Sequence, residues 1–430
     1  MSASSLWRRS DSSRWLILTQ YYKPELGAAQ TRLSNFAREL QRHGIELEVL
    51  TGMPNYPAGK IADGYRWKLA MDETIDGVPV HRVPLIPGSG RSSALRLANY
   101  VSFTSTSLVS SILRRKPGLV FLESLPLSLG MVTLALKTMY GIPYIFNVPD
   151  LQVDVARGLG FVHNERLLSA AQALEDKLAK SAWMVSTVTP GFIEHYVERG
   201  VERKRVSFLP NGADTDFLKP QPPSQALLER WPSLKGKKVF LYVGTHAIYH
   251  GMDTLLEAAY LLKDNPDIAF LFVGKGPERE HMKQTVAERG MQNVVFGDSP
   301  YEESDQLYSI AYASLAALRD IPVAQTMRLA KVMPSLSCGV PMIFAGKGES
   351  PELLEANRCG VAVPPEQPAA LAEAMVAFAN DPDRRQTMSI AARDLAVREY
   401  NWSGIVDRWL GEVAELMRSD GWDGRLLPKS

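Results

Sequence analysis

A chain of 430 residues, 45% of them hydrophobic, is too long for one ordinary core and is expected to form about two domains. Its formal net charge of +1 gives no reason to expect nucleic acid or an acidic polymer as a partner. The two cysteines, Cys338 and Cys359, are too few for a disulfide framework and are expected as buried thiols in a reducing compartment.

The N-terminal segment and the longest apolar run bear on localisation. Residues 1–14 carry charges and no apolar region long enough for a signal peptide. The run Ser124–Leu136 contains a proline and is too short to span a bilayer. The sequence therefore predicts a soluble, cytoplasmic protein, for which a peripheral contact with the inner face of the membrane remains open.

Strand and helix patterns alternate through the first half of the chain. Strands are expected at 15–19, 46–51, 79–85, 118–123, 143–148, 183–189 and 205–210, and helices near 30–43, 93–115, 125–140, 165–180 and 190–199. Such alternation predicts a mostly parallel sheet with helices on both faces.

The proline-rich segment Lys219–Ser224 can continue neither a helix nor a ladder, so it marks a domain boundary. Alternation then restarts, with strands at 239–243, 268–274, 293–297, 314–319, 342–346 and 360–364 and helices near 303–312, 368–380 and 383–400. We therefore expect an α/β protein of two doubly wound, Rossmann-like domains, residues 14–218 and 225–400, facing each other across a cleft. A C-terminal helix, residues 401–420, is expected to pack back on the first domain.

The stretch Lys238–Leu262 reads as a buried strand, a glycine-bounded loop and a helix. The helix would place four residues on one apolar face: Leu255, Leu256, Ala259 and Leu262. A helix N-terminus that follows a parallel strand is a ready anion site, because its first N–H groups lack intrahelical partners. The alternative is an ordinary βα unit without a ligand.

Three other glycine-bearing turns follow predicted strands. Gly27 lies in Tyr21–Arg32, before a helix that offers its N-terminus, although a tight βα turn explains it equally well. Leu271–Glu280 forms a turn against which a flat ring could rest. Gly346–Glu349 brings a lysine and carboxylates together, which suits a phosphate and a polyhydroxylated group, or else is a solvated loop. The G-x-G-x-x-G fingerprint is absent, so no nicotinamide or flavin cofactor is expected.

Two patterns have the spacing of metal sites. Asp214 and Asp216 are separated as in the D-x-D motif of metal-dependent sugar transferases, but they follow an Asn-Gly turn signal and are read as turn residues. His246 and His250 have H-x-x-x-H spacing, but they lie in a predicted loop, and Ala247 stands where a metalloprotease carries its glutamate. No metal ion is expected.

Taken together, six segments carry a family resemblance: 21–59, 75–85, 147–160, 206–220, 271–280 and 339–365. With them the chain resembles the retaining glycosyltransferases of family 4, which have the GT-B architecture, and in particular the bacterial branch that builds surface polysaccharides or decorates lipid-linked sugars. The resemblance extends from Trp15 to about Leu416.

The resemblance implies transfer of a hexosyl or N-acetylhexosaminyl group from a nucleotide-diphosphate sugar, with a UDP-sugar expected as co-substrate and no other cofactor. The acceptor would be a saccharide, a lipid-linked saccharide or a glycoside. Asp150 matches an Asp near the reacting centre and is the catalytic candidate. The donor-binding candidates are Gly27, Thr245, His250, Gly274, Gly276, Pro277, Arg328, Lys331, Gly348, Glu349 and Glu352.

Two features depart from the family pattern. Thr245 and His250 stand where the family usually carries an arginine and a lysine that clamp the diphosphate. Thr326 and Pro334 stand in place of the paired glutamates. Lys331 is retained, and a nearby Arg328 would serve as a second cation. These losses leave open a degenerate homologue that binds a nucleotide sugar or acts as a scaffold, and, more remotely, a nucleotide-sugar epimerase.

The helix near Ser93–Arg115 carries leucines, Tyr100 and Phe103. At or near its ends are four arginines: Arg91, Arg96, Arg114 and Arg115. It is read as an amphipathic helix packed on the sheet. The functional alternative is a surface near the acceptor that touches anionic lipid.

Overall fold

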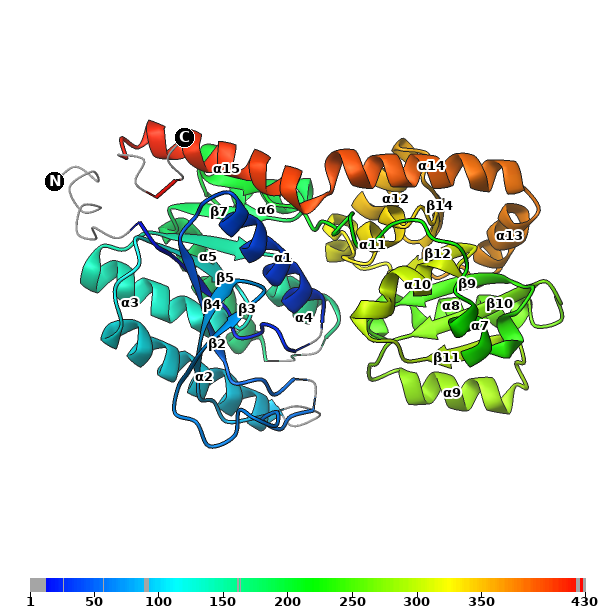
Figure 1. Cartoon of the computed structure of the whole chain (residues 1–430), viewed down its shortest axis with the longest axis horizontal. Helices are drawn as coiled ribbons and strands as arrows, with labels where there is room; N and C mark the ends of the chain where they lie inside the picture. The colour runs from blue at the N-terminus through cyan, green and yellow to red at the C-terminus, as the bar shows by residue number, and fades with distance from the viewer. Residues whose placement is uncertain are drawn as a thin grey trace. The chain divides into compact units, whose positions relative to one another are not determined.

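The computed structural model describes residues 13–25, 27–56, 58–88, 93–160, 162, 164–422 and 426–427. It divides into two compact units (Figure 1). The N-terminal unit comprises Met1–Val153, Val162–Pro210 and Trp402–Ser430, and the C-terminal unit comprises Asp154–Phe161 and Asn211–Asn401. The C-terminal unit thus starts before the proline-rich segment and also takes in a short piece of chain that follows Val153.

The N-terminal unit is built on an eight-stranded sheet in the order β3-β4-β2-β1-β5-β6-β7-β8. Its strands are β1 (Trp15–Leu18), β2 (Leu47–Gly52), β3 (Met71–Ile75), β4 (Val78–Val83), β5 (Leu119–Glu123), β6 (Tyr144–Val148), β7 (Met184–Thr187) and β8 (Val206–Phe208). The pairings are parallel except β3 with β4. The central strands are buried throughout, as a sheet covered on both faces requires, and are apolar except for Glu123 in β5 and Asn147 in β6.

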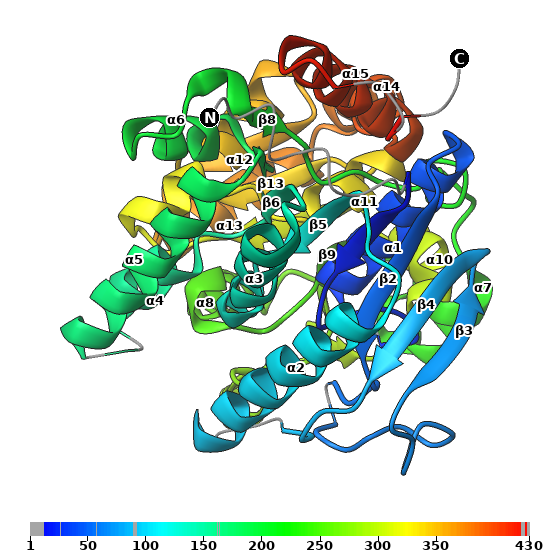
Figure 2. The same ribbon diagram turned by 90° about the vertical axis from the view of Figure 1, so that its left-hand side faces the viewer.

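The helices of this unit include α1 (Ala28–Arg42), α2 (Ser93–Leu113), α3 (Gly130–Tyr140), α5 (Glu165–Ser181), α6 (Pro190–Glu198) and α15 (Trp402–Ser419). Helix α4 (Gln152–Gly158) has its first two residues in this unit and the others in the C-terminal unit. Helix α2 packs beside α3, and α1 packs beside α15 (Figure 2). Among the described residues, no helix is long and apolar enough to cross a membrane.

Strand β3 is absent from the sequence prediction. It pairs antiparallel with β4 at the edge of the sheet, and its MDETI sequence alternates between half-buried and exposed positions. Its charges hid the strand pattern, but the Asp76-Gly77 turn, with φ angles of 51° and 83°, is a hairpin signal that could have revealed it. The short helix α4 was missed as well.

The C-terminal unit has a six-stranded parallel sheet in the order β11-β10-β9-β12-β13-β14. Its strands are β9 (Lys238–Val243), β10 (Ile268–Val273), β11 (Val294–Gly297), β12 (Ala313–Ala317), β13 (Met342–Ala345) and β14 (Gly360–Val363). Its helices include α7 (Gln225–Arg230), α8 (Met252–Leu261), α9 (Arg279–Glu288), α10 (Ser304–Ser309), α11 (Val332–Ser337), α12 (Glu349–Ala356), α13 (Pro368–Ala379) and α14 (Pro382–Glu399). The expectation of two α/β units on parallel sheets is confirmed.

Strand β9 lies in the middle of this second sheet, between β10 and β12. The apolar face predicted for the following helix is buried in the core: Leu255, Leu256, Ala259 and Leu262 are each at most 9% exposed. The βα unit of residues 238–262 therefore centres the second unit, as the pattern indicated.

Helix α15 belongs to the N-terminal unit although it comes last in the chain. Trp409 is fully buried, with its ring 5.3 Å from Phe36 and 5.9 Å from Phe121 between centroids. Its indole N–H lies 3.0 and 3.1 Å from the hydroxyls of Ser186 and Ser207, so the polar atom of the buried ring is satisfied.

Candidate functional site

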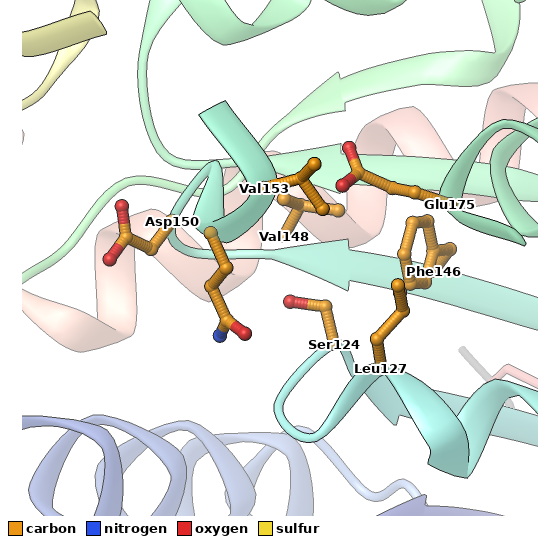
Figure 3. Close-up of a pocket in the computed structure, with 8 residues that line it drawn as sticks. Ser124, Leu127, Phe146, Val148, Asp150, Val153 and Glu175 are labelled. Atoms are coloured by element: carbon orange, nitrogen blue, oxygen red, sulfur yellow. The ribbon is translucent and has the colours of Figure 1, made fainter. Parts of the chain in front are cut away.

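Asp150 lies just beyond the carboxyl end of β6, where Pro149 prevents the strand from continuing and α4 begins two residues later. It lines a pocket with Ser124, Leu127, Phe146, Val148, Gln152, Val153 and Glu175 (Figure 3). The open volume is about 20 Å³, which is room for a water molecule rather than a sugar.

Two polar atoms of this pocket lack a partner. Asp150 Oδ1 and Ser124 Oγ are buried without a hydrogen-bond partner in the described part of the chain. Burial raises the pKa of Asp150 to about 6, although the Leu151 N–H opposes the shift. A carboxyl group with that pKa can accept or release a proton near neutrality.

Glu175 is the other carboxylate of the pocket, and Figure 3 shows it separated from Asp150 by Val148 and Val153. It accepts a hydrogen bond of 2.7 Å from the Tyr196 hydroxyl and is 4% exposed. Glu175 is therefore held by its own structural contacts, and the two carboxylates do not form a pair.

A buried ion pair that sequence reasoning missed lies at the same sheet edge. Arg32 of α1 contacts Glu123 at 3.3 Å and Asn147 at 3.0 Å, and Asn147 bonds to Glu123 at 2.5 Å. Burial raises the pKa of Glu123, which the arginine opposes. The pair joins α1 to the carboxyl ends of β5 and β6, and Gly27 is the residue just before this helix. The sequence signal that could have revealed this pair is a polar residue in each of two otherwise apolar strands, Glu123 in β5 and Asn147 in β6.

In the C-terminal unit, the turns after β9 and β10 touch each other. A Cβ atom on Gly274 would lie 2.1 Å from the carbonyl oxygen of Gly244, and one on Gly276 would lie 2.3 Å from that of His246. The His246 N–H donates to the Lys275 carbonyl at 2.9 Å. Glycine is required because the two backbones are in contact here, and Pro277 then leads into α9.

Lys331 reaches this pair of turns from the residue before α11. Its Nζ is buried, has no hydrogen-bond partner among the described residues, and lies 3.7 Å from the centroid of the Tyr242 ring. A Cβ on Gly244 would lie 3.2 Å from that nitrogen. Burial holds the pKa of Lys331 well below its usual range.

The two histidines beside Lys331 are neutral at pH 7. Burial, assisted by Lys331, lowers the pKa of His250 to about 3, and burial lowers that of His246 to about 4. His250 Nδ1 lies 2.8 Å from the Thr245 carbonyl oxygen and donates to it. The structure therefore brings Thr245, His250 and Lys331 together, but His250 supplies no positive charge there.

Other donor-binding candidates of the C-terminal unit lie at and before the start of α12. Arg328 contacts Glu349 at 3.3 Å and the Tyr400 hydroxyl at 3.1 Å. Gly348 precedes α12 with a φ of 89°, and a Cβ there would lie 2.0 Å from the Gln325 carbonyl oxygen. Arg328 is thus already engaged with a carboxylate and a hydroxyl.

Glu352 lies with Glu349 in the first turn of α12. The Thr326 hydroxyl donates to the Val323 carbonyl at 3.0 Å, and Pro334 lies within the first turns of α11. Neither position can supply a carboxylate. Within the described ranges, no three His, Cys, Asp or Glu side chains are grouped so that they could hold a metal ion.

Two Rossmann-like units, each on a mainly parallel sheet, are the architecture of the GT-B class. Residues 27–212 match the glycosyl transferase 4-like domain, and residues 224–395 match the glycosyl transferases group 1 domain. The chain belongs to this glycosyltransferase family and is a glycosyltransferase.

Two curated relatives and one solved structure place the chain among known proteins. The putative colanic acid biosynthesis glycosyl transferase WcaI of Escherichia coli is 26% identical over 285 residues, which cover 64% of this chain and 69% of WcaI. The GDP-mannose-dependent alpha-(1-6)-phosphatidylinositol monomannoside mannosyltransferase of Mycobacterium tuberculosis is 24% identical over 220 residues, 50% of this chain and 56% of that relative. Anabaena HepE, solved in complex with UDP-glucose, has a TM-score of 0.70 at 16% identity and covers 94% of this chain and 99% of its own. The likeness to HepE shows the fold.

Proposed function

We propose that the chain transfers a sugar from a nucleotide-diphosphate sugar to a saccharide, a lipid-linked saccharide or a glycoside, with retention at the anomeric carbon and without a metal ion. The observation that carries the proposal is Lys331, a buried amine without a partner among the described residues that faces two glycine turns. A buried amine without a partner is stabilised in its charged form by an anion. A diphosphate suits the position, because α8 follows β9, the strand of Tyr242, and offers its N-terminus to an anion.

Donor binding would join Lys331 to the backbone of the two turns. The Gly244 N–H already donates to the Val273 carbonyl at 2.9 Å, but the absence of a side chain at Gly244, where a Cβ would lie 3.2 Å from Lys331 Nζ, leaves room for a ligand beside that nitrogen. Protonated Lys331 would offset the charge that develops on the leaving diphosphate, which is the role that a metal ion fills in other transferases. Arg328 could bind the diphosphate only after its ion pair with Glu349 breaks.

Asp150 would act on the acceptor side. During transfer the bond from the anomeric carbon to the diphosphate oxygen breaks, and the acceptor oxygen bonds to the same face of the sugar. The acceptor proton passes to the departing diphosphate oxygen. The Asp150 carboxylate and the Ser124 hydroxyl would orient the acceptor hydroxyl or stabilise the positive charge on the sugar, because both have unused hydrogen-bonding capacity.

The donor base and the acceptor are proposed more broadly. The expected co-substrate is a UDP-sugar, which agrees with the UDP-glucose complex of HepE, whereas the mycobacterial relative is GDP-mannose-dependent. A lipid-linked acceptor would bring the protein to the inner face of a membrane as a peripheral protein.

Donor affinity and turnover test the proposal. Titration calorimetry with UDP and GDP on the wild-type chain and on Lys331→Met should show affinity for one of them that falls about 10- to 100-fold in the variant, because a charged hydrogen bond is lost. Lys204→Met, which removes an exposed lysine of the N-terminal unit paired with Glu202 at 3.0 Å, is the control and should bind normally. Equal affinity of Lys331→Met and the wild type would remove the proposed donor site.

Turnover distinguishes the transferase from a degenerate homologue. A panel of UDP- and GDP-sugars is incubated with soluble glycosides, and release of the nucleotide diphosphate is followed. The wild type should release it in the presence of an acceptor, and Asp150→Asn should not. Tight donor binding without release from any sugar would instead support the non-catalytic alternative.

A further inference from the structure

Trp67 lies in the loop before β3, and its side chain is 100% exposed. Its φ angle is 63°, in the left-handed region that a bulky residue rarely adopts. Full exposure of a large aromatic side chain leaves about 150–250 Å² of mostly apolar surface in water. The unfavourable backbone and the exposed ring together indicate that Trp67 meets a ligand.

The loop that carries Trp67 is fixed by contacts of the two residues before it. The Tyr65 hydroxyl donates to Glu73 at 3.1 Å, and the guanidinium of buried Arg82 lies 5.2 Å from the centre of the Tyr65 ring. The Arg66 side chain donates to a backbone carbonyl of the same loop at 3.1 Å. The indole ring is therefore presented on a loop whose position is set by contacts with the sheet.

Strand order places Trp67 at the same sheet edge as Asp150. Strand β3 runs antiparallel to β4 at the side of the sheet (Figure 2), and its first residue, Met71, pairs with Arg82 near the end of β4. The residues before β3 thus lie at the carboxyl edge of the parallel strands, where Asp150 follows β6. Five strand spacings separate β3 from β6, a span of about 24 Å at about 4.8 Å per spacing.

Two tyrosines lie at intermediate positions along this edge. Tyr56 follows β2 and Tyr21 follows β1, and both strands lie between β3 and β6 in the sheet. The two rings meet edge to face with their centroids 5.6 Å apart, and Tyr56 is 46% exposed. The buried Glu25 carboxylate accepts the Tyr56 N–H at 2.8 Å and so holds this residue in place. Along the edge the order is Trp67, Tyr56, Tyr21 and then Asp150.

The chemistry of these three aromatic residues fits a saccharide. An aromatic face stacks against the C–H groups on one side of a sugar ring, and phenol hydroxyls bond to sugar oxygens. Burial raises the pKa of Tyr21, so its hydroxyl remains a hydrogen-bond donor at neutral pH. Rings spaced along an edge offer separate stacking surfaces, whereas a protein partner is met by one contiguous apolar core.

We propose that Trp67, Tyr56 and Tyr21 form an aromatic track that binds an extended oligosaccharide acceptor. Trp67 stacks against a sugar several residues away from the one that receives the transferred group. A monosaccharide or disaccharide at Asp150 is too short to reach Trp67, so the track selects an oligosaccharide. This inference deepens the proposed function and rests on it, because Asp150 marks the reacting end of the acceptor.

An oligosaccharide array tests the aromatic track on the full chain. The array carries glucose, mannose, galactose, N-acetylhexosamine and uronic acid oligomers, from single sugars to long chains. At least one long oligomer should bind the wild type more tightly than its own mono- and disaccharide fragments. Trp67→Ala should lower that affinity about tenfold or more, because a stacking surface is lost, and Trp67→Phe should restore much of it. The matched control is Leu69→Ala, which removes an 87% exposed aliphatic side chain from the same loop and should bind as the wild type does.

Turnover gives a second measurement. With the oligosaccharide as acceptor, Trp67→Ala should raise KM about tenfold and leave kcat nearly unchanged, because Trp67 lies far from the reacting atoms. With a monosaccharide glycoside as acceptor, the variant and the wild type should have the same KM. Equal melting temperatures show that the variants fold.

The outcomes separate the aromatic track from the transferase. Oligosaccharide binding that depends on Trp67, without nucleotide diphosphate release from any donor, supports the track and contradicts the transferase. Transfer to glycosides combined with equal oligosaccharide affinity of Trp67→Ala and the wild type leaves the transferase intact and overturns the track. An array on which no long oligomer binds better than its fragments also overturns it. So does a Trp67-dependent dimer or Trp67-dependent vesicle binding in place of oligosaccharide binding.

Discussion

The Nζ atom of Lys331 lies 3.7 Å from the centroid of the Tyr242 ring, in a buried position where the described residues offer it no hydrogen-bond acceptor. An amine so placed is poorly solvated, and its uncharged form is favoured until an anion arrives. The neighbouring ionisable groups, Tyr242 on β9 and His246 and His250 in the following loop, carry no negative charge at neutral pH.

Nucleotide diphosphate binding is therefore expected to be coupled to proton uptake. The diphosphate raises the pKa of Lys331 from its lowered value toward the usual 10.5, so affinity should fall as the pH rises through the interval between the two. Calorimetry at several pH values between about 6 and 9, in buffers of different ionisation enthalpy, measures the number of protons taken up. Lys331→Met should abolish the uptake, and a wild type without uptake at any pH would contradict the prediction.

Asp150→Asn is expected to stabilise the protein while it reduces activity. The pKa of Asp150 is raised from 3.8 to about 6, so the native state binds its proton more tightly than the unfolded state. The stability that this group contributes is fully present below about pH 4 and is lost as the pH rises through about 6. At pH 7 the variant should gain about 1 to 3 kcal/mol in free energy of unfolding, and at pH 4 little or nothing. Urea unfolding at both pH values measures the difference, with exposed Asp407→Asn as control; a variant that is less stable at pH 7 would refute the assignment.

Glu349→Gln should destabilise the C-terminal unit. It leaves the Arg328 guanidinium, 7% exposed, without its carboxylate, and removal of one partner from a buried ion pair costs about 3 kcal/mol. A double-mutant cycle with Arg328→Met measures the coupling. If Arg328 instead serves the donor, Arg328→Met will weaken nucleotide binding strongly and the cycle will show little coupling.

Trp409→Ala should cost about 3 to 5 kcal/mol, because it empties a large buried site among Phe36, Phe121 and the strands. Trp409→Phe keeps most of the volume but leaves the Ser186 and Ser207 hydroxyls without the indole donor, so a loss of about 1 to 2 kcal/mol is expected. Thermal or urea unfolding of both variants checks the order. A Trp409→Phe variant as stable as the wild type would mean that packing alone holds α15, and equal losses in the two variants would contradict the expected dominance of packing.

The sequence pattern was sufficient for the parallel strands, because their near-continuous apolar runs are distinctive. It failed for β3, whose MDETI sequence reads as loop and whose pairing depends on the hairpin turn. For α2 it predicted an amphipathic helix packed on the sheet, but periodicity alone cannot say which side faces inward. The side that faces inward is set by hydrogen bonds to Gln20 and to the Pro84 and Ile86 carbonyls. These partners lie outside the helix, so the helical pattern contains no information about them.

In the candidate site, too, the sequence predicted some features and not others. Glycines at strand ends indicated where backbone comes close to backbone, and Gly274 and Gly348 do so. The contact between Lys331 and Tyr242, and that between Arg328 and Glu349, join residues from different βα units, so spacing along the chain could not predict them. The unpartnered Asp150 oxygen is likewise a property of the folded pocket.

Because α15 completes the first unit from the far end of the chain, biosynthesis imposes an order on its assembly. During translation, the core of the first unit lacks the Trp409 side chain until every residue of the second unit has been synthesised. A ribosome-stalled chain that ends before residue 402 should therefore expose Phe36 and Phe121 to chaperones and proteases, even where its eight strands have already paired.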